Sequence, residues 1–219
     1  MDIKLFSYWR SSAAFRVRIA LNLKNLSHEI IPVDLLKQGG EQHHPSYSTK
    51  NPQDLVPVLE YGSHVLRQSL AIIEFLEETY PTPALLPKNP HERAWVRALS
   101  MDIACDIHPL NNLRVMKYLH KQLELGDGQK SSWTKHWIDL GLAGVEKTLS
   151  SKPRTGKFCL GDEPGMADTC LIPQIMNAKA NDCDLSHFPN IQQVFDECMK
   201  LPAFIEASWE SQVDCPNKS

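Results

Sequence analysis

The sequence predicts a protein of the α/β plus all-α class, in which a mixed α/β domain is followed by an all-helical domain. Three observations predict it. The period of the apolar residues changes several times within roughly the first eighty residues, which is typical of alternating strands and helices. Prolines 81, 83, 87 and 90 then crowd one short segment. Beyond that segment the apolar residues keep a helical period, without strand-like alternation of any length.

The first domain opens with a strand and a helix. Apolar and aromatic residues over 3–8 predict a buried strand. From Ser12 the pattern becomes helical, because apolar residues follow Ala13 at i+4, i+7 and i+8. Arg16 and Arg18 fall between these positions, so we expect them on the polar side of the helix.

Three further strands and a second helix complete the predicted domain. Residues 29–33 form a β-rich run, and residues 56–61 and 64–66 form a strand pair joined by the turn Gly62-Ser63. Ser69 is placed to N-cap the next helix. The resulting order, β-α-β-(short helix)-β-β-α, is that of a thioredoxin-like domain, and a small ferredoxin-like domain is the alternative.

The proline-rich segment over residues 80–90 predicts the domain boundary, because such a density of proline disfavours both helix and strand. We therefore expect a first domain over residues 1–83 and a helical domain over residues 88–219. Helices in the second domain are predicted over residues 91–120, 132–150, 166–180, 191–200 and 203–210.

Composition excludes several classes of protein. The apolar fraction of 42% and the charged fraction of 22% are ordinary for a globular protein. A net charge of −3 argues against a nucleic-acid scaffold, and the apolar runs are too short to span a membrane. Without a secretory signal at the start, we expect a cytoplasmic protein. The six cysteines include no C-x-x-C pair, so we expect reduced and mostly buried thiols.

The turn between the first strand and the first helix is the strongest candidate site. It contains Arg10, Ser11 and Ser12. Free backbone N–H groups and the helix dipole favour an anion or a thiolate at such a position. A serine hydroxyl can donate to a thiolate and lower its pKa. The alternative is that either serine only caps the helix.

Two weaker constellations follow along the chain. Val56-Pro57 opens a strand and could adopt a cis bond, and Gln68 and Ser69 begin the next helix. Taken alone, these residues are better explained by a strand-edge proline and a helix cap than by a binding site. In the run DIHPLNNLR, a helical spacing places His108 and Asn112 one turn apart, close to Arg114. No third ligand is spaced to join them, so we assign no metal.

Several motifs together resemble the zeta class of the glutathione transferase superfamily, which includes maleylacetoacetate isomerase. They are YWRSSAAFRVRIAL, NPQDLVPVLE, VLRQSLAIIEFLEETYPTPALLP, DIHPLNNLRV, GDEPGMADTCLIPQ and DLSHFPNI. The resemblance covers nearly the whole chain. It implies a thioredoxin-like domain joined to an all-helical domain, glutathione as cofactor and a homodimer.

The resemblance also implies roles for individual residues. Ser11 would face the glutathione sulfur, with Ser12 beside it. Apart from the resemblance, we expect Arg10 to act as a catalytic residue that clamps a substrate carboxylate or stabilises the developing enolate, with Arg114 as the second choice. The remaining implied glutathione-binding residues are Gln42, Val56 (followed by Pro57 in cis), Gln68, Ser69, His108, Asn112 and Arg114.

The sequence departs from the zeta pattern in places that bear on chemistry. Ala13 stands where the family has a cysteine, which excludes a cysteine-assisted role. Gly165 replaces the usual Ser or Thr before M-A-D, where Asp168 is expected to accept from free N–H groups at the helix start. The run DIHPLNN is nearer to the related maleylpyruvate isomerases, but Lys179 and Ala180 stand where those tend to carry an arginine pair, which puts maleylpyruvate as the substrate in doubt.

The resulting hypothesis is a glutathione-dependent cis–trans isomerase. It would convert maleylacetoacetate to fumarylacetoacetate, in tyrosine and phenylalanine catabolism, by thiolate addition, rotation and elimination. Its small-molecule substrate would be a diacid. The alternatives are a maleylpyruvate isomerase, a general glutathione transferase that releases stable conjugates, and a non-catalytic binding module of the same fold.

Overall fold

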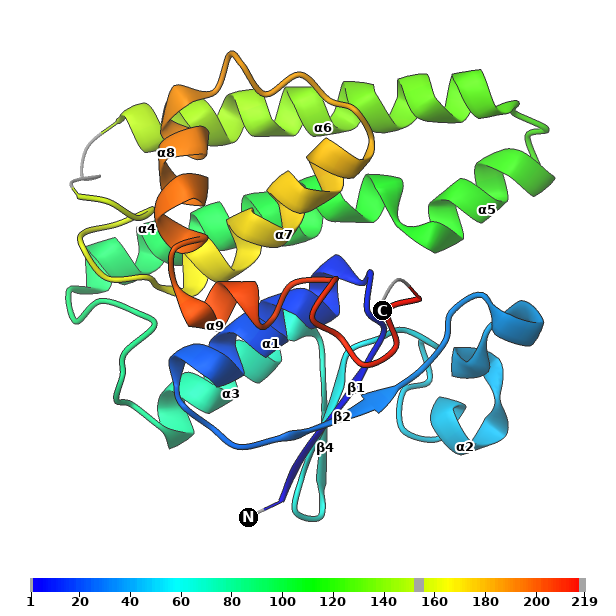
Figure 1. Ribbon diagram of the computed structural model, residues 1–219, viewed down its shortest axis with the longest axis horizontal. Helices are drawn as coiled ribbons and strands as arrows, with labels where there is room; N and C mark the ends of the chain where they lie inside the picture. Colours follow the sequence, from blue (N-terminus) through cyan, green and yellow to red (C-terminus); the bar gives the residue numbers. More distant parts are fainter. Residues whose placement is uncertain (1, 152–155, 217–219) are drawn as a thin grey trace. The chain divides into compact units, whose positions relative to one another are not determined.

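The first part of the chain forms a four-stranded mixed sheet. The computed structural model describes residues 2–151 and 156–216. Strands β1 (Ile3–Ser7), β2 (Glu29–Pro32), β3 (Val58–Tyr61) and β4 (His64–Arg67) lie in the order β2-β1-β3-β4. Strand β1 is parallel to β2 and antiparallel to β3, and β3 is antiparallel to β4. This arrangement confirms the predicted thioredoxin-like order (Figure 1).

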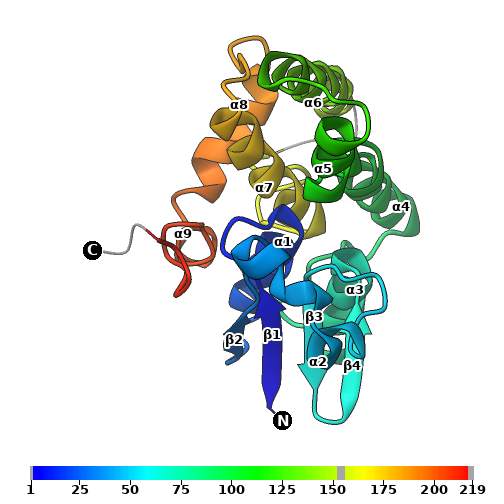
Figure 2. The ribbon, with the colours of Figure 1, turned by 90° about the vertical axis from the view of Figure 1, so that its right-hand side faces the viewer.

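Helices cover both faces of this sheet. The longer helices are α1 (Ser12–Leu23) and α3 (Ser69–Thr79), and the short elements are η1 (Lys37–Gly39), η2 (Glu41–His43) and α2 (Pro45–Ser48). Ile3, Leu5 and Ser7 of β1 are buried at every second position, as a strand with one fully covered face requires. Phe6 points to the opposite face and meets the ring of Tyr47 edge to face, which places α2 on that side (Figure 2).

Helix α1 differs from the sequence prediction at its arginines. Both Arg16 and Arg18 are only 2% exposed, so neither lies on a solvent-facing side. The prediction was wrong because two long side chains can be buried when each finds hydrogen-bond acceptors. Ser69 also differs from the prediction, since it is the first residue of α3 and Gln68 takes the N-cap position.

The second part of the chain is helical, as predicted. It contains α4 (Pro90–Met101), α5 (Leu113–Lys121), α6 (Asp127–Ser150), α7 (Met166–Ala180) and α8 (Pro189–Cys198). Its core includes Ile138 and Leu142 of α6 and Ile172 of α7, all fully buried. Helix α7 begins and ends where the sequence predicted.

The single helix predicted over residues 91–120 is interrupted. After α4 the backbone widens into a π-helical segment, η3 (Asp102–Ile107), and tightens into η4 (His108–Asn111) before α5 begins. Pro109 supplies no N–H to a continuing helix, and Asn112 is extended and caps the next one. We had expected His108 and Asn112 to lie one turn apart on a single helix. This prediction was wrong, because the helix is interrupted between them.

The contacts within the chain define two compact units, residues 1–85 with 199–219, and residues 86–198. The last segment contains the short helix α9 (Pro202–Ile205), so the helix predicted over 203–210 ends early. Asn22 donates to the Ala203 carbonyl at 3.0 Å, which fixes this segment against α1. The domain limits 1–83 and 88–219 stay a prediction. The contacts of the C-terminal segment show in addition that it packs on the first unit.

Most of the cysteine side chains are buried. None of the six cysteines, all of which the structure describes, is joined in a disulfide. Cys159, Cys170, Cys198 and Cys215 are buried as expected, whereas Cys105 is exposed. Within residues 2–151 and 156–216, no helix is long and apolar enough to cross a membrane.

Candidate functional site

The strand register of the first unit brings three of the predicted segments to one edge of the sheet. Phe6 pairs with Val58, and Val58 pairs with Arg67. From this row β1 continues into the turn before α1, β3 is entered through Val56-Pro57, and β4 continues into Gln68-Ser69. The sequence had indicated each segment separately, and the antiparallel pairing places them side by side.

The turn between β1 and α1 is built around Ser11, which is the N-cap of α1. Its hydroxyl oxygen accepts from the Ala14 N–H at 3.2 Å, and its carbonyl accepts from Phe15. Ser11 therefore caps α1, and this contact leaves open a further role for its hydroxyl proton. Because a hydroxyl carries one donor besides its acceptors, the cap leaves the Ser11 proton available to a ligand. Ser12 is buried as the first residue of α1, and Arg10 is exposed.

A buried arginine holds this turn from within the unit. The Arg18 guanidinium donates to the carbonyl of Trp9 at 3.1 Å, to that of Tyr8 at 3.4 Å and to the Ser7 hydroxyl at 2.9 Å. It also donates to the Ala207 carbonyl at 2.9 Å. Burial lowers the pKa of Arg18 to about 9. The sequence analysis placed Arg18 on the polar side of the helix and gave it no role in the site. The signal that could have found that role is its position between the apolar residues Val17 and Ile19.

The entry to β3 offers backbone groups to a ligand. The Val56-Pro57 peptide bond is cis, as the resemblance implied. Among the described residues, neither the N–H nor the carbonyl of Val56 makes a hydrogen bond. An unpaired backbone next to a strand is an element to which a bound peptide can add main-chain hydrogen bonds.

The start of α3 places one polar side chain outside and one inside. Gln68 is exposed and adopts φ 70°, ψ 118°, a conformation that side-chain-bearing residues rarely take. Ser69 is buried, and its hydroxyl oxygen accepts from the Arg16 guanidinium at 3.2 Å. Arg16 thereby connects α1 to the first residue of α3.

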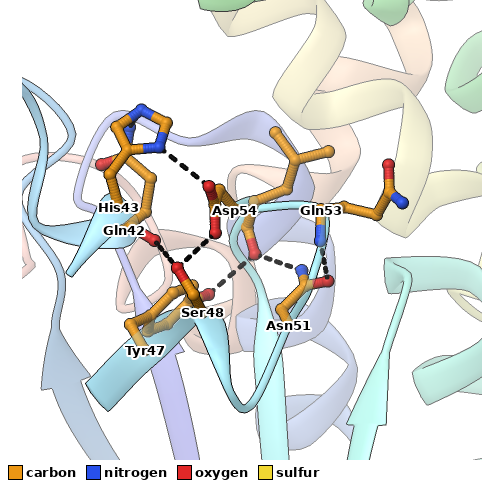
Figure 3. Close-up of polar contacts among 8 residues, drawn as sticks. Gln42, His43, Tyr47, Ser48, Asn51, Gln53 and Asp54 are labelled. Carbon is orange, nitrogen blue, oxygen red and sulfur yellow. Dashed lines mark hydrogen bonds and ion pairs between the residues drawn. The ribbon is translucent and has the colours of Figure 1, made fainter. Parts of the chain in front are cut away.

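Gln42 belongs to a polar network with His43, Ser48 and Asp54 (Figure 3). Asp54 accepts from the Ser48 hydroxyl at 2.7 Å and pairs with His43 at 3.0 Å. These two contacts, that from Ser48 first, lower the pKa of Asp54. The Gln42 side chain is buried, its nitrogen lies 3.0 Å from His43, and its oxygen has no hydrogen-bond partner within the described part of the chain.

The residues predicted from the DIHPLNNLR run lie in the second unit. His108 is half-buried in η4, and Arg114 is exposed in the first turn of α5. The Asn112 side chain accepts from the Arg114 N–H at 3.1 Å, so it acts as a helix cap. In the ranges 2–151 and 156–216, no group of three or more His, Cys, Asp or Glu side chains is placed to hold a metal ion.

Asp168 confirms the expected structural role of the GMAD motif. Its carboxylate accepts from the Gly165 N–H at 2.8 Å and from the Cys159 N–H at 2.9 Å, and it is 1% exposed. Burial raises the pKa of Asp168 against the lowering effect of these donors.

Comparison with known proteins identifies the family. A family model described as "Glutathione S-transferase, N-terminal domain" matches residues 5–84. A probable maleylacetoacetate isomerase of Vibrio cholerae is 49% identical over 98% of this chain and 99% of that protein. The holo structure of a maleylpyruvate isomerase, described as a bacterial zeta-class glutathione S-transferase, superposes with a TM-score of 0.93 at 43% identity, covering 96% of this chain and 99% of the other. The chain belongs to the zeta class of the glutathione S-transferase family.

A second solved relative was crystallised with ligands. The maleylacetoacetate isomerase of Methylobacterium extorquens AM1, with bound malonate and GSH, has a TM-score of 0.93 and is 38% identical over 97% of this chain and 99% of that one. The comparisons thus confirm the fold and the family that the motifs predicted, including the thioredoxin-like first domain.

Proposed function

We propose that this chain is a glutathione-dependent cis–trans isomerase that converts maleylacetoacetate to fumarylacetoacetate. The observation that carries the proposal is Ser11, which caps α1 with its hydroxyl proton uncommitted and begins a helix with no acidic residue in its first turn. A thiolate at this position would meet a hydroxyl donor and the positive end of the helix dipole together.

The residues of the first unit fit a γ-glutamyl tripeptide. The unpaired backbone of Val56 suits the main chain of a peptide, and the exposed Gln68 beside Ser69 at the start of α3 suits its carboxylate end. The side-chain oxygen of Gln42 is buried and has no hydrogen-bond partner among the described residues, so this acceptor is left unmet within the protein. We assign these residues, with Ser12, to glutathione binding, and keep His108, Asn112 and Arg114 as proposed contacts from the second unit.

Each catalytic role follows from the chemistry of one side chain. Bound glutathione supplies a thiolate that adds to the cis double bond and leaves again once the resulting single bond has rotated. Ser11 donates its proton to the sulfur, and each unit by which the thiol pKa falls corresponds to about 1.4 kcal/mol. Arg10 binds a carboxylate of the diacid or the developing enolate, and Arg114 is the second choice for this role.

Related activities share this site. Maleylpyruvate isomerisation needs the same thiolate, and a structural relative carries that name. Lys179 and Ala180, however, stand where an arginine pair would be expected for that substrate. A general transferase would release a stable conjugate and accept uncharged electrophiles. A binding module without catalysis would have no need for the Ser11 hydroxyl.

The wider setting belongs to the same proposal. We infer a cytoplasmic homodimer that acts in tyrosine and phenylalanine catabolism on a small diacid, without a nucleic-acid or membrane partner. The support is the family membership, the names of the relatives and the modest net charge of −3.

The deciding experiment measures isomerisation of maleylacetoacetate with and without glutathione. We compare the wild type with Ser11→Ala and with Ser63→Ala, whose serine is exposed in the β3–β4 turn. Turnover should require glutathione and fall about a hundredfold or more in Ser11→Ala only, as for loss of an oriented donor. A folded, glutathione-binding wild type without turnover would refute the proposal and direct the assay to maleylpyruvate and to conjugation substrates.

A further inference from the structure

The C-terminal segment, residues 199–216, contacts the turn that carries Ser11. The Asp214 carboxylate accepts from the Trp9 N–H at 2.9 Å, although the two residues are 205 positions apart. The rings of Trp9 and Trp209 meet edge to face with 6.4 Å between their centroids. The local sequence around Ser11 does not predict these contacts.

Both polar groups of the Trp9 backbone are held by side chains. Asp214 accepts from its N–H, while Arg18 donates to its carbonyl at 3.1 Å. Arg18 also donates to the Ala207 carbonyl, so the same guanidinium fixes the turn and the C-terminal segment. The turn two residues before Ser11 therefore depends for its conformation on a segment from the other end of the chain.

Trp209 supports the side chain of Arg10. The guanidinium carbon of Arg10 lies 5.6 Å from the centroid of the Trp209 ring, within the range of a cation–π contact. Trp209 is 7% exposed, whereas Arg10 is exposed. A buried ring below an exposed guanidinium restricts its directions while leaving its N–H donors available to a carboxylate.

We infer that Asp214 and Trp209 are positioning residues of the active site. Asp214 fixes the turn that presents the Ser11 hydroxyl to sulfur, and Trp209 orients Arg10 toward the carboxylate of the diacid. The inference rests on the proposed function. It names Asp214 as a residue that affects ionisation of the glutathione thiol and Trp209 as one that affects the preference for a diacid. Neither residue touches the reacting atoms.

The two roles predict different defects. In Asp214→Ala the ultraviolet absorbance of bound thiolate and kcat should both fall about tenfold or more, because small misplacements of catalytic groups are costly. Asp214→Asn keeps an acceptor for the Trp9 N–H and should stay within about threefold of wild type. In Trp209→Leu the KM for the diacid should rise about five- to tenfold with unchanged glutathione affinity, and Trp209→Phe should recover most of it.

The control and the contrary results are equally specific. Val213→Ala changes an exposed residue of the same segment, 64% accessible, and should match wild type throughout. Equal thiolate absorbance and kcat in Asp214→Ala and wild type, or a Trp209→Leu defect that is the same for neutral electrophiles and for the diacid, would overturn the inference.

The readouts separate this inference from the proposed function. A wild type that ionises bound glutathione but does not isomerise maleylacetoacetate would refute the proposed function, and the thiolate absorbance of Asp214→Ala would still decide the role of Asp214. The diacid-versus-neutral comparison for Trp209 would then use conjugation substrates. A wild type that binds no glutathione would overturn both.

Discussion

Removing the Asp168 carboxylate should destabilise the helical unit by an amount that the structure allows us to work out. The carboxylate accepts from the N–H groups of Gly165 and Cys159 at 2.8 and 2.9 Å. Leaving a buried donor without a partner costs roughly 1–3 kcal/mol, so losing both would cost about 2–6 kcal/mol. Asp168 is itself only 1% exposed, so its removal also relieves the cost of keeping a carboxylate away from water, and this relief offsets part of the loss. We therefore expect about 3 kcal/mol for Asp168→Ala.

The assay is urea unfolding followed by circular dichroism, with Asp168→Asn as the graded variant. The asparagine oxygen retains one of the two acceptors, so its cost should be about 1–2 kcal/mol. Asp196→Ala removes an exposed carboxylate of α8 in the same unit and should change the free energy of unfolding by less than about 0.5 kcal/mol. A loss below 1 kcal/mol in Asp168→Ala, or equal losses in both Asp168 variants, would refute the reasoning.

The sign of the pH dependence gives an independent check on Asp168. Its folded pKa is raised above the ordinary value of 3.8, so the unfolded chain loses this proton first as the pH rises. The contribution of Asp168 to stability is therefore fully present below pH 3.8 and declines as the pH passes through the raised folded pKa. Measured as wild type minus Asp168→Asn, the free energy of unfolding should fall with rising pH across this window, and a rise would contradict the raised pKa.

Two further predictions concern the first unit. Lys24 donates to Glu77 at 2.8 Å from a buried position, so Lys24→Met should lower the free energy of unfolding by about 3–5 kcal/mol in urea titrations, and a loss under 1 kcal/mol would contradict it. Gly40 has φ +119°, and a Cβ there would lie 2.5 Å from the Gln42 side chain, so Gly40→Ala should displace that side chain. We expect the glutathione Kd measured by calorimetry to rise roughly tenfold, as for loss of one hydrogen bond in a desolvated site; an unchanged Kd would remove Gln42 from the binding site.

Much of the fold could be predicted because its signals are local. Alternating burial along β1 and the turn residues after β3 are features of neighbouring positions. Asn112 and Pro109 were visible too, but their effect on helix continuity was underestimated, since a capping side chain and a missing N–H outweigh an apolar period that continues past them. The π-helical η3 had no local signal. Ile107 of η3 lies so close to α6 that a Cβ on Gly141 would be 2.3 Å from its side chain. The segment therefore packs against a helix more than thirty positions away in sequence.

The residues of the candidate site also fall into those with a local sequence signal and those placed only by tertiary contacts. Ser11, Gln68 and Ser69 were recognisable because helix starts have a sequence signature and an intrinsic affinity for anions. Arg18 was assigned to the wrong side of α1, since its burial depends on carbonyls of a turn and of residue 207. No local pattern could have connected Asp214 with Trp9.

The sequence by itself determined the order of strands and helices in the first unit, the helical character of the second unit and the family, because periodicity, caps and motifs act over a few positions. Only the tertiary structure decided which of these segments meet. Antiparallel pairing of β1, β3 and β4 collects three separate turns at one edge, and the C-terminal segment closes on the first of them through Asp214, Trp209 and Arg18. Such contacts join residues up to 205 positions apart, and they form because buried donors and charges require partners wherever the chain supplies them.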